Sequence, residues 1–299
     1  MKKQAKETKD ILHPYGSLDV LAYYSKVARF LEKFLKGKEI AVKVYLPKEI
    51  PFYLKRGSNS KPLFIQILKE VDEKMLKLRA EHSLQEVKQE LNEKQALIWE
   101  YFVPRKLMDF FYACNGEHPG KQIDRIFIDI DKGKQIKSEI AQQVAKELVQ
   151  AIKKDKEFNK FIKYDLFIMW TGSSFHIYLL LKKPVNLGSY NKNLAYHKDF
   201  PLDSFTGRWA QEIRKKLKIN VQGGHEKTPK HITIDPSGTP SGKLARVPFS
   251  LHMKNAREID GVAIPLNEKE LEDKNLVKKL RALTPEKVLK NINSYSKLL

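Results

Sequence analysis

The segment from Arg125 to Asp131, Arg-Ile-Phe-Ile-Asp-Ile-Asp, constrains the fold more than any other part of the chain. In a β-strand alternate side chains share a face, so its three isoleucines point one way and Asp129 and Asp131 point the other. The segment therefore predicts a strand in a sheet with one buried face. Two carboxylates at this spacing repel each other unless a cation or proton lies between them. A divalent metal would satisfy them, because hard cations take oxygen ligands. Two exposed acids on an edge strand remain the alternative.

A second alternating segment begins after the turn Thr171-Gly172-Ser173-Ser174. Backbone N–H groups and hydroxyls of such a turn can hold phosphate oxygens. Ser174, His176 and Tyr178 share one face of the strand that follows. A histidine at this position can donate to a triphosphate, although a half-buried histidine in an ordinary hairpin is the alternative.

Two further segments repeat the pattern. His231–Asp235 ends in an aspartate, which is either a third metal-binding acid or the first residue of the next turn. When the segment 246–252 is read as extended, Arg246, Ser250 and His252 share a face that suits an anionic ligand. The alternative is a surface strand of a basic protein. Together, the four segments supply carboxylates for two metals and donors for a triphosphate, which is the inventory of nucleotidyl transfer.

The charge of the chain points to a polyanionic partner. It has 56 Lys and Arg against 36 Asp and Glu, a formal net charge of +20. Such an excess favours nucleic acid, since phosphate neutralisation supplies most non-specific affinity. An anionic membrane surface is the lesser rival. The basic N-terminus is followed by no apolar stretch, and no apolar run reaches spanning length. With the single cysteine Cys114, which rules out a disulfide framework, these features predict a cytoplasmic, nucleoid-associated protein.

Periodicity predicts an α+β protein in one domain, residues 1–299, with a lead-in at 1–16 and a helical tail at 267–299. The expected helices are 17–36, beginning at a Ser17 cap, and 65–102, 135–161 and 206–217. The expected strands are 40–46, 123–131, 166–170, 175–181, 231–235 and 262–266. Residues 184–204 are expected to form a loop.

The order of these motifs resembles the archaeo-eukaryotic primase superfamily. That superfamily carries an acid-x-acid strand, then a Ser/Gly turn leading to x-His, then a lone Asp at the end of a strand. The matching residues here are Asp129-Ile130-Asp131, Ser173-Ser174-Phe175-His176 and Asp235. The segment from Arg246 to His252 is similar to the "R-x-P-x-S-L-H" stretch of archaeal primase catalytic subunits.

The N-terminal part resembles one branch, the polymerase domain of end-joining DNA ligases of the ligase D type. The similar segments are Leu18–Ala28, Lys36–Ile40, Phe52–Arg56 and Asp124–Asp129, and the resemblance spans roughly residues 18–266. Two positions depart from this branch. Ser174 stands where the branch has Lys or Arg, and Met108-Asp109-Phe110-Phe111 lacks the His of its Glu-x-His motif. Replicative primases often hold a zinc knob of Cys and His, which one cysteine cannot build.

The resemblance implies a primase-polymerase fold, with mixed and antiparallel sheets flanked by helices around a central active-site cleft. It implies two Mg²⁺ or Mn²⁺ ions on Asp129, Asp131 and Asp235. The residues implied for nucleotide binding are Ser173, Ser174, His176, Arg246, Ser250, His252 and Lys55. The implied partners are a DNA template with a primer or broken end, nucleoside triphosphates, and either a DNA ligase with a Ku-like protein or a primase large subunit.

The implied activity is template-dependent nucleotide addition to a primer or broken end in non-homologous end joining. A primase that starts chains de novo would share the same site. A metal-dependent nuclease would also use acids and a histidine, but it does not need the triphosphate-binding set. A non-catalytic nucleic-acid-binding module is disfavoured, because acids on strand faces repel phosphates unless metals intervene.

Overall fold

The computed structural model describes residues 20–46, 52–226 and 228–299, and it is an α+β protein as predicted. The helices are α2 (Leu21–Leu31), α3 (Glu73–Glu81), α4 (Leu84–Val87), α5 (Glu93–Tyr101), α6 (Ser138–Lys154), α7 (Lys156–Phe161), α8 (Leu187–Asn193), α9 (Phe205–Leu217), α10 (Leu276–Arg281) and α11 (Pro285–Tyr295). The strands are β1 (Glu39–Val44), β2 (Tyr53–Lys55), β3 (Leu63–Phe64), β4 (Met108–Ala113), β5 (Ile123–Lys132), β6 (Tyr164–Trp170), β7 (Phe175–Val185), β8 (Val221–Gly223), β9 (Ile232–Asp235), β10 (Leu244–Arg246), β11 (Leu251–Asn255), β12 (Glu258–Val262) and β13 (Ile264–Leu266). Short 3-10 helices cover Ile65–Glu70, Lys88–Glu90, Pro201–Asp203, Glu268–Glu272 and Ser296–Leu298.

A six-stranded sheet carries the predicted acidic strand at its centre. Its order is β13-β6-β7-β5-β9-β8, and its pairs are antiparallel except the parallel pair of β8 and β9. One face of β5 presents Ile126, Ile128 and Ile130, which are fully buried. Helix α6 contacts β5 and β7, and its own apolar stripe recurs at helical spacing. The isoleucines therefore bury one face of β5, and the acids occupy the other.

A smaller antiparallel sheet is built around the N-terminal strands. Its order is β10-β4-β1-β2, with β3 also paired to β1. Helix α2 and the turn after it pack aromatic side chains against this sheet. The ring centroids of Tyr24 in α2 and Phe110 lie 4.9 Å apart, and those of Phe34 in the turn and Tyr112 lie 5.9 Å apart. Such aromatic packing anchors the helix on the sheet.

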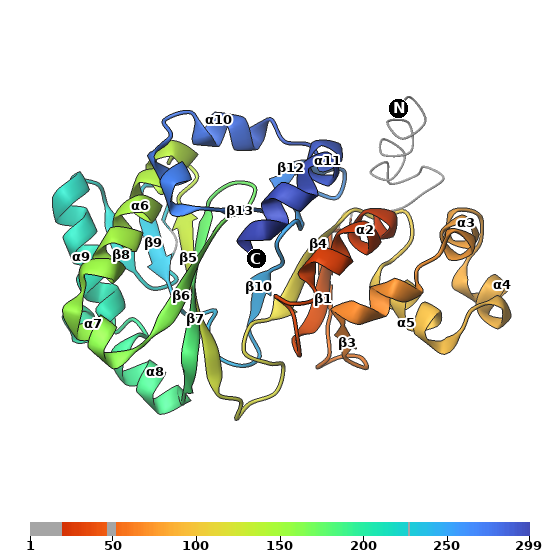
Figure 1. Ribbon diagram of the computed structural model, residues 1–299, viewed down its shortest axis with the longest axis horizontal. Coiled ribbons are helices and arrows are strands. Elements are labelled where there is room, and N and C mark those ends of the chain that lie inside the picture. The colour runs from red at the N-terminus through yellow and green to blue at the C-terminus, as the bar shows by residue number, and fades with distance from the viewer. Residues whose placement is uncertain (1–19, 47–51, 227) are drawn as a thin grey trace.

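Segments distant in sequence connect the two sheets (Figure 1). After β9 the chain leaves the larger sheet, and β10 pairs with β4 in the N-terminal one. The region 267–299 is helical, as predicted, and it folds back, so that α11 contacts α2 and α10 contacts α6. The C-terminal segment is therefore part of the packed structure.

Helix boundaries in the charged region follow capping residues. The predicted helix 65–102 is divided into short helices that begin after Asp72, Ser83 and Asn92. Asp72 accepts a hydrogen bond from the Met75 amide at 2.7 Å, and Asn92 accepts one from the Gln95 amide at 2.9 Å. Side chains that satisfy a new helix start interrupt the preceding helix.

Three other expectations differ from the structure. The predicted loop 184–204 contains α8, which is capped by Asn186 through the Ser189 amide. The predicted helix 135–161 is two helices that meet at Asp155, the cap of α7. Strand β4 was not predicted: its residues are buried on both sides, so no alternation marks it. The Ser17 cap lies outside the described residues.

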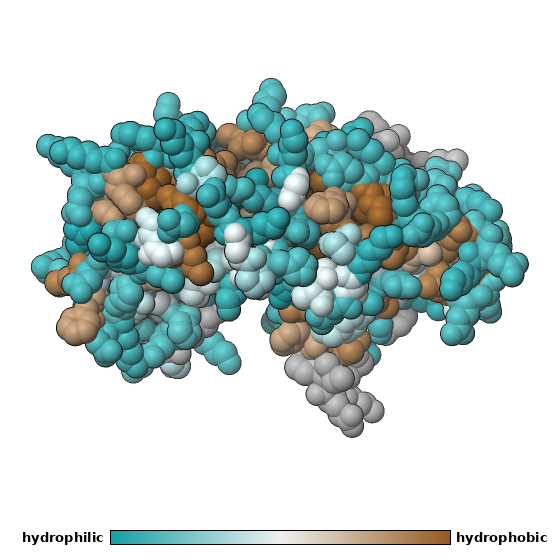
Figure 2. Space-filling model, turned by 90° about the horizontal axis from the view of Figure 1, so that it is seen from below, coloured by the Kyte–Doolittle hydropathy of each residue, from teal (hydrophilic) through white to brown (hydrophobic). Residues whose placement is uncertain are grey.

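The surface agrees with the composition. Seen from below, the face is largely hydrophilic, and it is indented between the part that contains the six-stranded sheet and the N-terminal part (Figure 2). Across the described ranges, no helix is both long and apolar enough to cross a membrane.

Candidate active site

The register of three neighbouring strands aligns the predicted site residues. Asp129 of β5 lies directly opposite Asp235 of β9 and, on its other side, directly opposite His176 of β7. Residues directly opposite in an antiparallel pair point to the same face, with Cα atoms roughly 4.5–5.5 Å apart. His176, Asp129 and Asp235 therefore form a row across the sheet.

Asp131 extends this row along β5. It lies two residues beyond Asp129, on the same face, and pairs with Thr233 of β9. Three carboxylates from segments about a hundred residues apart thus gather on one side of the sheet. Their charges repel, and bound cations would relieve that repulsion.

The carboxylates fit a metal site by chemistry and by register. Hard divalent cations favour carboxylate oxygens, and substrate phosphates usually complete their coordination. Yet within the described ranges, no three Asp, Glu, His or Cys side chains stand in a ready-made metal cluster. One oxygen of Asp235, Oδ1, accepts a hydrogen bond from the Ser237 amide at 2.8 Å, which fixes this carboxylate at the turn.

His176 lies between the acids and Tyr178. Its Nε2 lies 3.3 Å from Asp129 Oδ1, and its Nδ1 lies 3.3 Å from the Tyr178 hydroxyl. That hydroxyl also donates to the Arg246 carbonyl at 3.3 Å. We call Asp129, Asp131 and Asp235 the acidic row. Tyr178, which the sequence placed on the same face as His176 without assigning it a role, connects this row through His176 to β10.

The turn before β7 is tightly held. Ser174 is buried, its hydroxyl donates to the Ile130 carbonyl, and its amide donates to Thr171 Oγ1 at 3.1 Å. The Ser174 hydroxyl therefore joins β5 to the turn. Ser173 is half-buried, and its carbonyl accepts a hydrogen bond from Ser138 at 2.7 Å.

Arg246 and Ser250 are embedded in the protein. Arg246 Nη1 lies 2.9 Å from Asp109 Oδ1 and 2.7 Å from the Leu251 carbonyl, and the Arg246 side chain is 10% exposed. Ser250 has no exposed surface, and its hydroxyl accepts from the Phe110 amide at 2.8 Å. The expectation of one extended stretch from 246 to 252 is wrong. The chain turns at Phe249, where φ is 67°, and β10 and β11 are separate strands.

His252 is held as a neutral group. Burial, and then the positive charge of Arg246, lower its pKa from 6.5 to about 4. Its Nδ1 lies 2.9 Å from the Thr171 carbonyl, so Nδ1 carries the proton and donates. A neutral imidazole with this tautomer presents only a lone pair at Nε2. His252 therefore does not supply the cationic donor that the sequence suggested.

Lys55 does not share a face with Arg246. It pairs with Val42 in the N-terminal sheet, whereas Arg246 aligns with Phe111 and Ala41. Because Val42 and Ala41 are adjacent, the register points Lys55 and Arg246 to opposite faces. The neighbouring Arg56 donates to Glu117 and to the Gly242 carbonyl, and so ties the end of β2 to the turn after β9.

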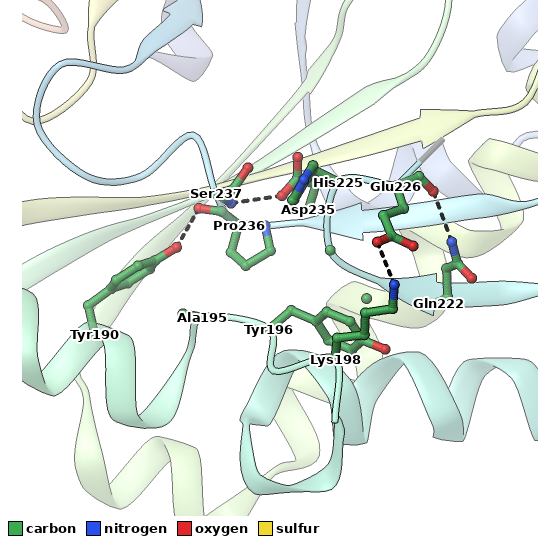
Figure 3. Close-up of a pocket in the computed structure, with 12 residues that line it drawn as sticks. Tyr190, Ala195, Tyr196, Lys198, Gln222, His225, Glu226, Asp235, Pro236 and Ser237 are labelled. Atoms are coloured by element: carbon green, nitrogen blue, oxygen red, sulfur yellow. Dashed lines mark hydrogen bonds and ion pairs between the residues drawn. The ribbon is translucent and has the colours of Figure 1, made fainter. Parts of the chain in front are cut away.

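Two features of the site had no signal in the sequence. Asp109, the partner of Arg246, stands within a strand that shows no alternation. A cavity of about 310 Å³ opens beside Asp235, between the segment 190–198 and the segment 222–226 (Figure 3). Its walls come from α8, β8, the end of β9 and the loops beside them, which are distant in sequence, so only the folded chain shows it.

Comparisons with known proteins give one informative result. The sequence matches no known family model and no curated protein. Among solved structures, the fold matches the polymerase domain of Mycobacterium tuberculosis ligase D in complex with DNA, with a TM-score of 0.57 and 16% sequence identity. The match covers 96% of this chain and 93% of that one. The chain is therefore similar in fold to this polymerase domain over nearly its whole length.

Proposed function

We propose that this protein is a nucleotidyltransferase that adds nucleotides to the 3′ end of a DNA strand opposite a template. The observation that carries the proposal is the register that aligns Asp235 and His176 with Asp129 across three strands. The likeness in fold to a polymerase domain in complex with DNA supports the same reading. On this basis we also propose a role at broken DNA ends.

The acidic row would hold two divalent cations, Mg²⁺ or Mn²⁺, through Asp129, Asp131 and Asp235. When bound, such ions activate an attacking hydroxyl and stabilise charge on the transferred and leaving phosphates. The hydrogen bond from the Ser237 amide orients the Asp235 carboxylate towards a fixed position. The protein's own contribution is thus preorganisation of oxygen ligands.

The triphosphate would lie on the β7 side of this row. His176 faces the row, and Ser173 stands in the turn that precedes it. Arg246 acts by positioning, because Asp109 offsets its charge and its backbone carbonyl holds Tyr178, which in turn contacts His176. His252 packs against this turn and orients it through the Thr171 carbonyl.

The test is primer extension with purified protein in Mg²⁺ and in Mn²⁺, on gapped, recessed and unprimed templates, with ribo- and deoxyribonucleotides. Asp129→Asn should lower the rate of addition by about a thousandfold, because metals supply several kcal/mol of transition-state stabilisation. DNA affinity, measured by fluorescence anisotropy, should change little.

Asp165→Asn is the matched control. Asp165 lies on β6 with its side chain 64% exposed, outside the acidic row. This variant loses the same charge and should extend primers normally. Normal extension by Asp129→Asn would refute the assignment, and release of nucleotides from DNA without added triphosphates would identify a nuclease instead.

A further inference from the structure

The cavity beside Asp235 occupies a defined place relative to the acidic row. In the sheet order β7-β5-β9-β8, His176 stands on one side of Asp129 and Asp235 on the other. Beyond Asp235, Gln222 and Gly223 of β8 form part of the cavity wall. The cavity therefore lies at the end of the row opposite to His176.

The geometry of phosphoryl transfer indicates which substrate group would lie in this cavity. The attacking and leaving oxygens lie roughly in line, on opposite sides of the transferred phosphorus. If the triphosphate lies on the His176 side, the attacking 3′-hydroxyl must approach from the Asp235 side. The group that carries this hydroxyl then falls where the cavity is.

One wall of the cavity is an aromatic ring seated on glycine backbone. A Cβ added to Gly223 would lie 2.2 Å from the Tyr196 ring, and one added to Gly224 would lie 2.7 Å from it. Only glycine allows so close an approach, and Gly224 also has a φ of +88°. Tyr196 is half-buried and lines the cavity, so the two glycines fix a ring at its wall.

Polar groups also line the cavity. Figure 3 shows Tyr190 and Tyr196 on one side of the cavity, and Asp235 and Pro236 on the other. The Tyr190 hydroxyl donates to the Pro236 carbonyl at 2.6 Å, which braces the turn behind Asp235. Lys198 and Glu226 also line the cavity, and their exposed side chains pair at 2.9 Å. The cavity thus combines an aromatic wall, a carboxylate of the site and a lysine.

We propose that this cavity is the acceptor site, which takes the nucleotide that carries the free 3′-hydroxyl. Tyr196 stacks on its base, Asp235 lies beside its sugar, and Lys198 lies near the preceding phosphate. The volume of about 310 Å³ is in the range of sites for small organic ligands. The proposal rests on the proposed function and names the part of the site that binds the acceptor.

Photocrosslinking tests this placement without requiring catalysis. A template annealed to a primer with 5-iododeoxyuridine at its 3′ end is bound to the wild-type protein and irradiated, and the crosslinked peptide is identified by mass spectrometry. The expected crosslink is to Tyr196. A crosslink confined to residues outside 190–198 and 222–226 would overturn the proposal.

Steady-state kinetics give the second readout. Tyr196→Ala should raise the KM for the primer–template about tenfold, as expected for a lost base–aromatic stack, and leave the KM for the incoming nucleotide unchanged. Tyr164→Ala, which removes another half-buried tyrosine on β6, should change neither value. Equal changes in both KM values, or an unchanged primer KM, would contradict the assignment.

The two proposals fail in distinguishable ways. If the wild-type protein adds no nucleotide, the proposed function fails, while the crosslink still reports whether a strand end enters the cavity. If it extends primers but crosslinks elsewhere, only the acceptor site is wrong. An unprimed template identifies the source of the acceptor: loss of dinucleotide synthesis in Tyr196→Ala indicates a free nucleotide, and synthesis on primed templates alone indicates a strand end.

Discussion

Asp109 is a residue on which the arrangement of the site depends although it stands outside the acidic row. Its side chain is 1% exposed, and its Oδ1 accepts from Arg246 Nη1 and from the Met253 amide, both at 2.9 Å. Its other oxygen has no hydrogen-bond partner among the described residues. The pair ties β4 to β10 and β11, and so fixes the carbonyl that holds Tyr178.

Breaking this pair should be costly. Asp109→Ala leaves a buried guanidinium without its counter-ion, and such losses cost about 3–5 kcal/mol of unfolding free energy. Urea unfolding measures the change. Asp165→Ala, which breaks the exposed pair with Lys182, should cost less than about 1 kcal/mol. Equal losses of unfolding free energy in the two variants would mean that the buried pair stabilises the protein no more than the exposed one.

His252 predicts a pH dependence of stability. Its pKa is about 4 in the folded protein, against an ordinary value of 6.5, so below pH 6.5 the unfolded state takes up a proton that the folded state does not. Stability should therefore fall as the pH drops from about 6.5 to 4, by up to about 3 kcal/mol. Unfolding free energies from pH 7 to pH 4 should show this loss in the wild-type protein and not in His252→Asn. Parallel curves for the two proteins would rule it out.

At the scale of elements, short connections set the positions of the site strands. Strand β9 pairs with β5 only from Asp129 to Lys132. Before Asp129, the side chain of Thr239 takes the place of a neighbouring strand. The Thr239 hydroxyl accepts from the Phe127 amide at 2.9 Å and donates to the Phe127 carbonyl at 3.0 Å. The turn after β9 thus satisfies the backbone N–H and C=O of Phe127, as a paired strand would.

The turn between β6 and β7 depends on Gly172. Its φ is +105°, and an added Cβ would lie 2.4 Å from the Cβ of His252. Gly120 is a matched control with φ of +87° and open space around it. Gly120→Ala should cost about 1–2 kcal/mol for the backbone alone, and Gly172→Ala about 1–3 kcal/mol more for the clash. Thermal unfolding measures both costs, and equal values would mean that the contact with His252 relaxes freely.

At the scale of the whole molecule, charge governs association. With a net charge of +20, the protein should bind DNA with a strong dependence on salt. If it neutralises six or more phosphates, its affinity should fall about a thousandfold or more between 50 and 200 mM NaCl. Fluorescence anisotropy of a labelled duplex across a salt series gives the slope. A flat dependence would argue against a phosphate-binding surface.

Much of the site could be predicted because it lies on strands whose sequences alternate apolar and polar residues. The segments 125–131 and His231–Asp235 alternate apolar and polar residues in sequence, and such alternation marks strands whose two faces differ, although β9 is buried on both faces in the structure. This pattern predicted that the acids and His176 lie on the polar faces of their strands, and the strand register shows that these are one face of one sheet. Strand β4 is buried on both sides and was missed, and the exposures of Ser250 and Arg246 were misjudged because a turn at Phe249 has no strong local signal.

The sequence by itself determined that Asp129 and Asp131 lie on the face of their strand opposite to the three isoleucines, since the two-residue period is a property of the backbone. It also determined the basic character of the molecule, since charge is a sum over residues. Only the tertiary structure decided that Asp235 lies opposite Asp129, that Asp109 neutralises Arg246, and that a cavity opens beside the acids. The reason is physical: register, burial and cavities depend on contacts between segments a hundred residues apart, and no local pattern contains them.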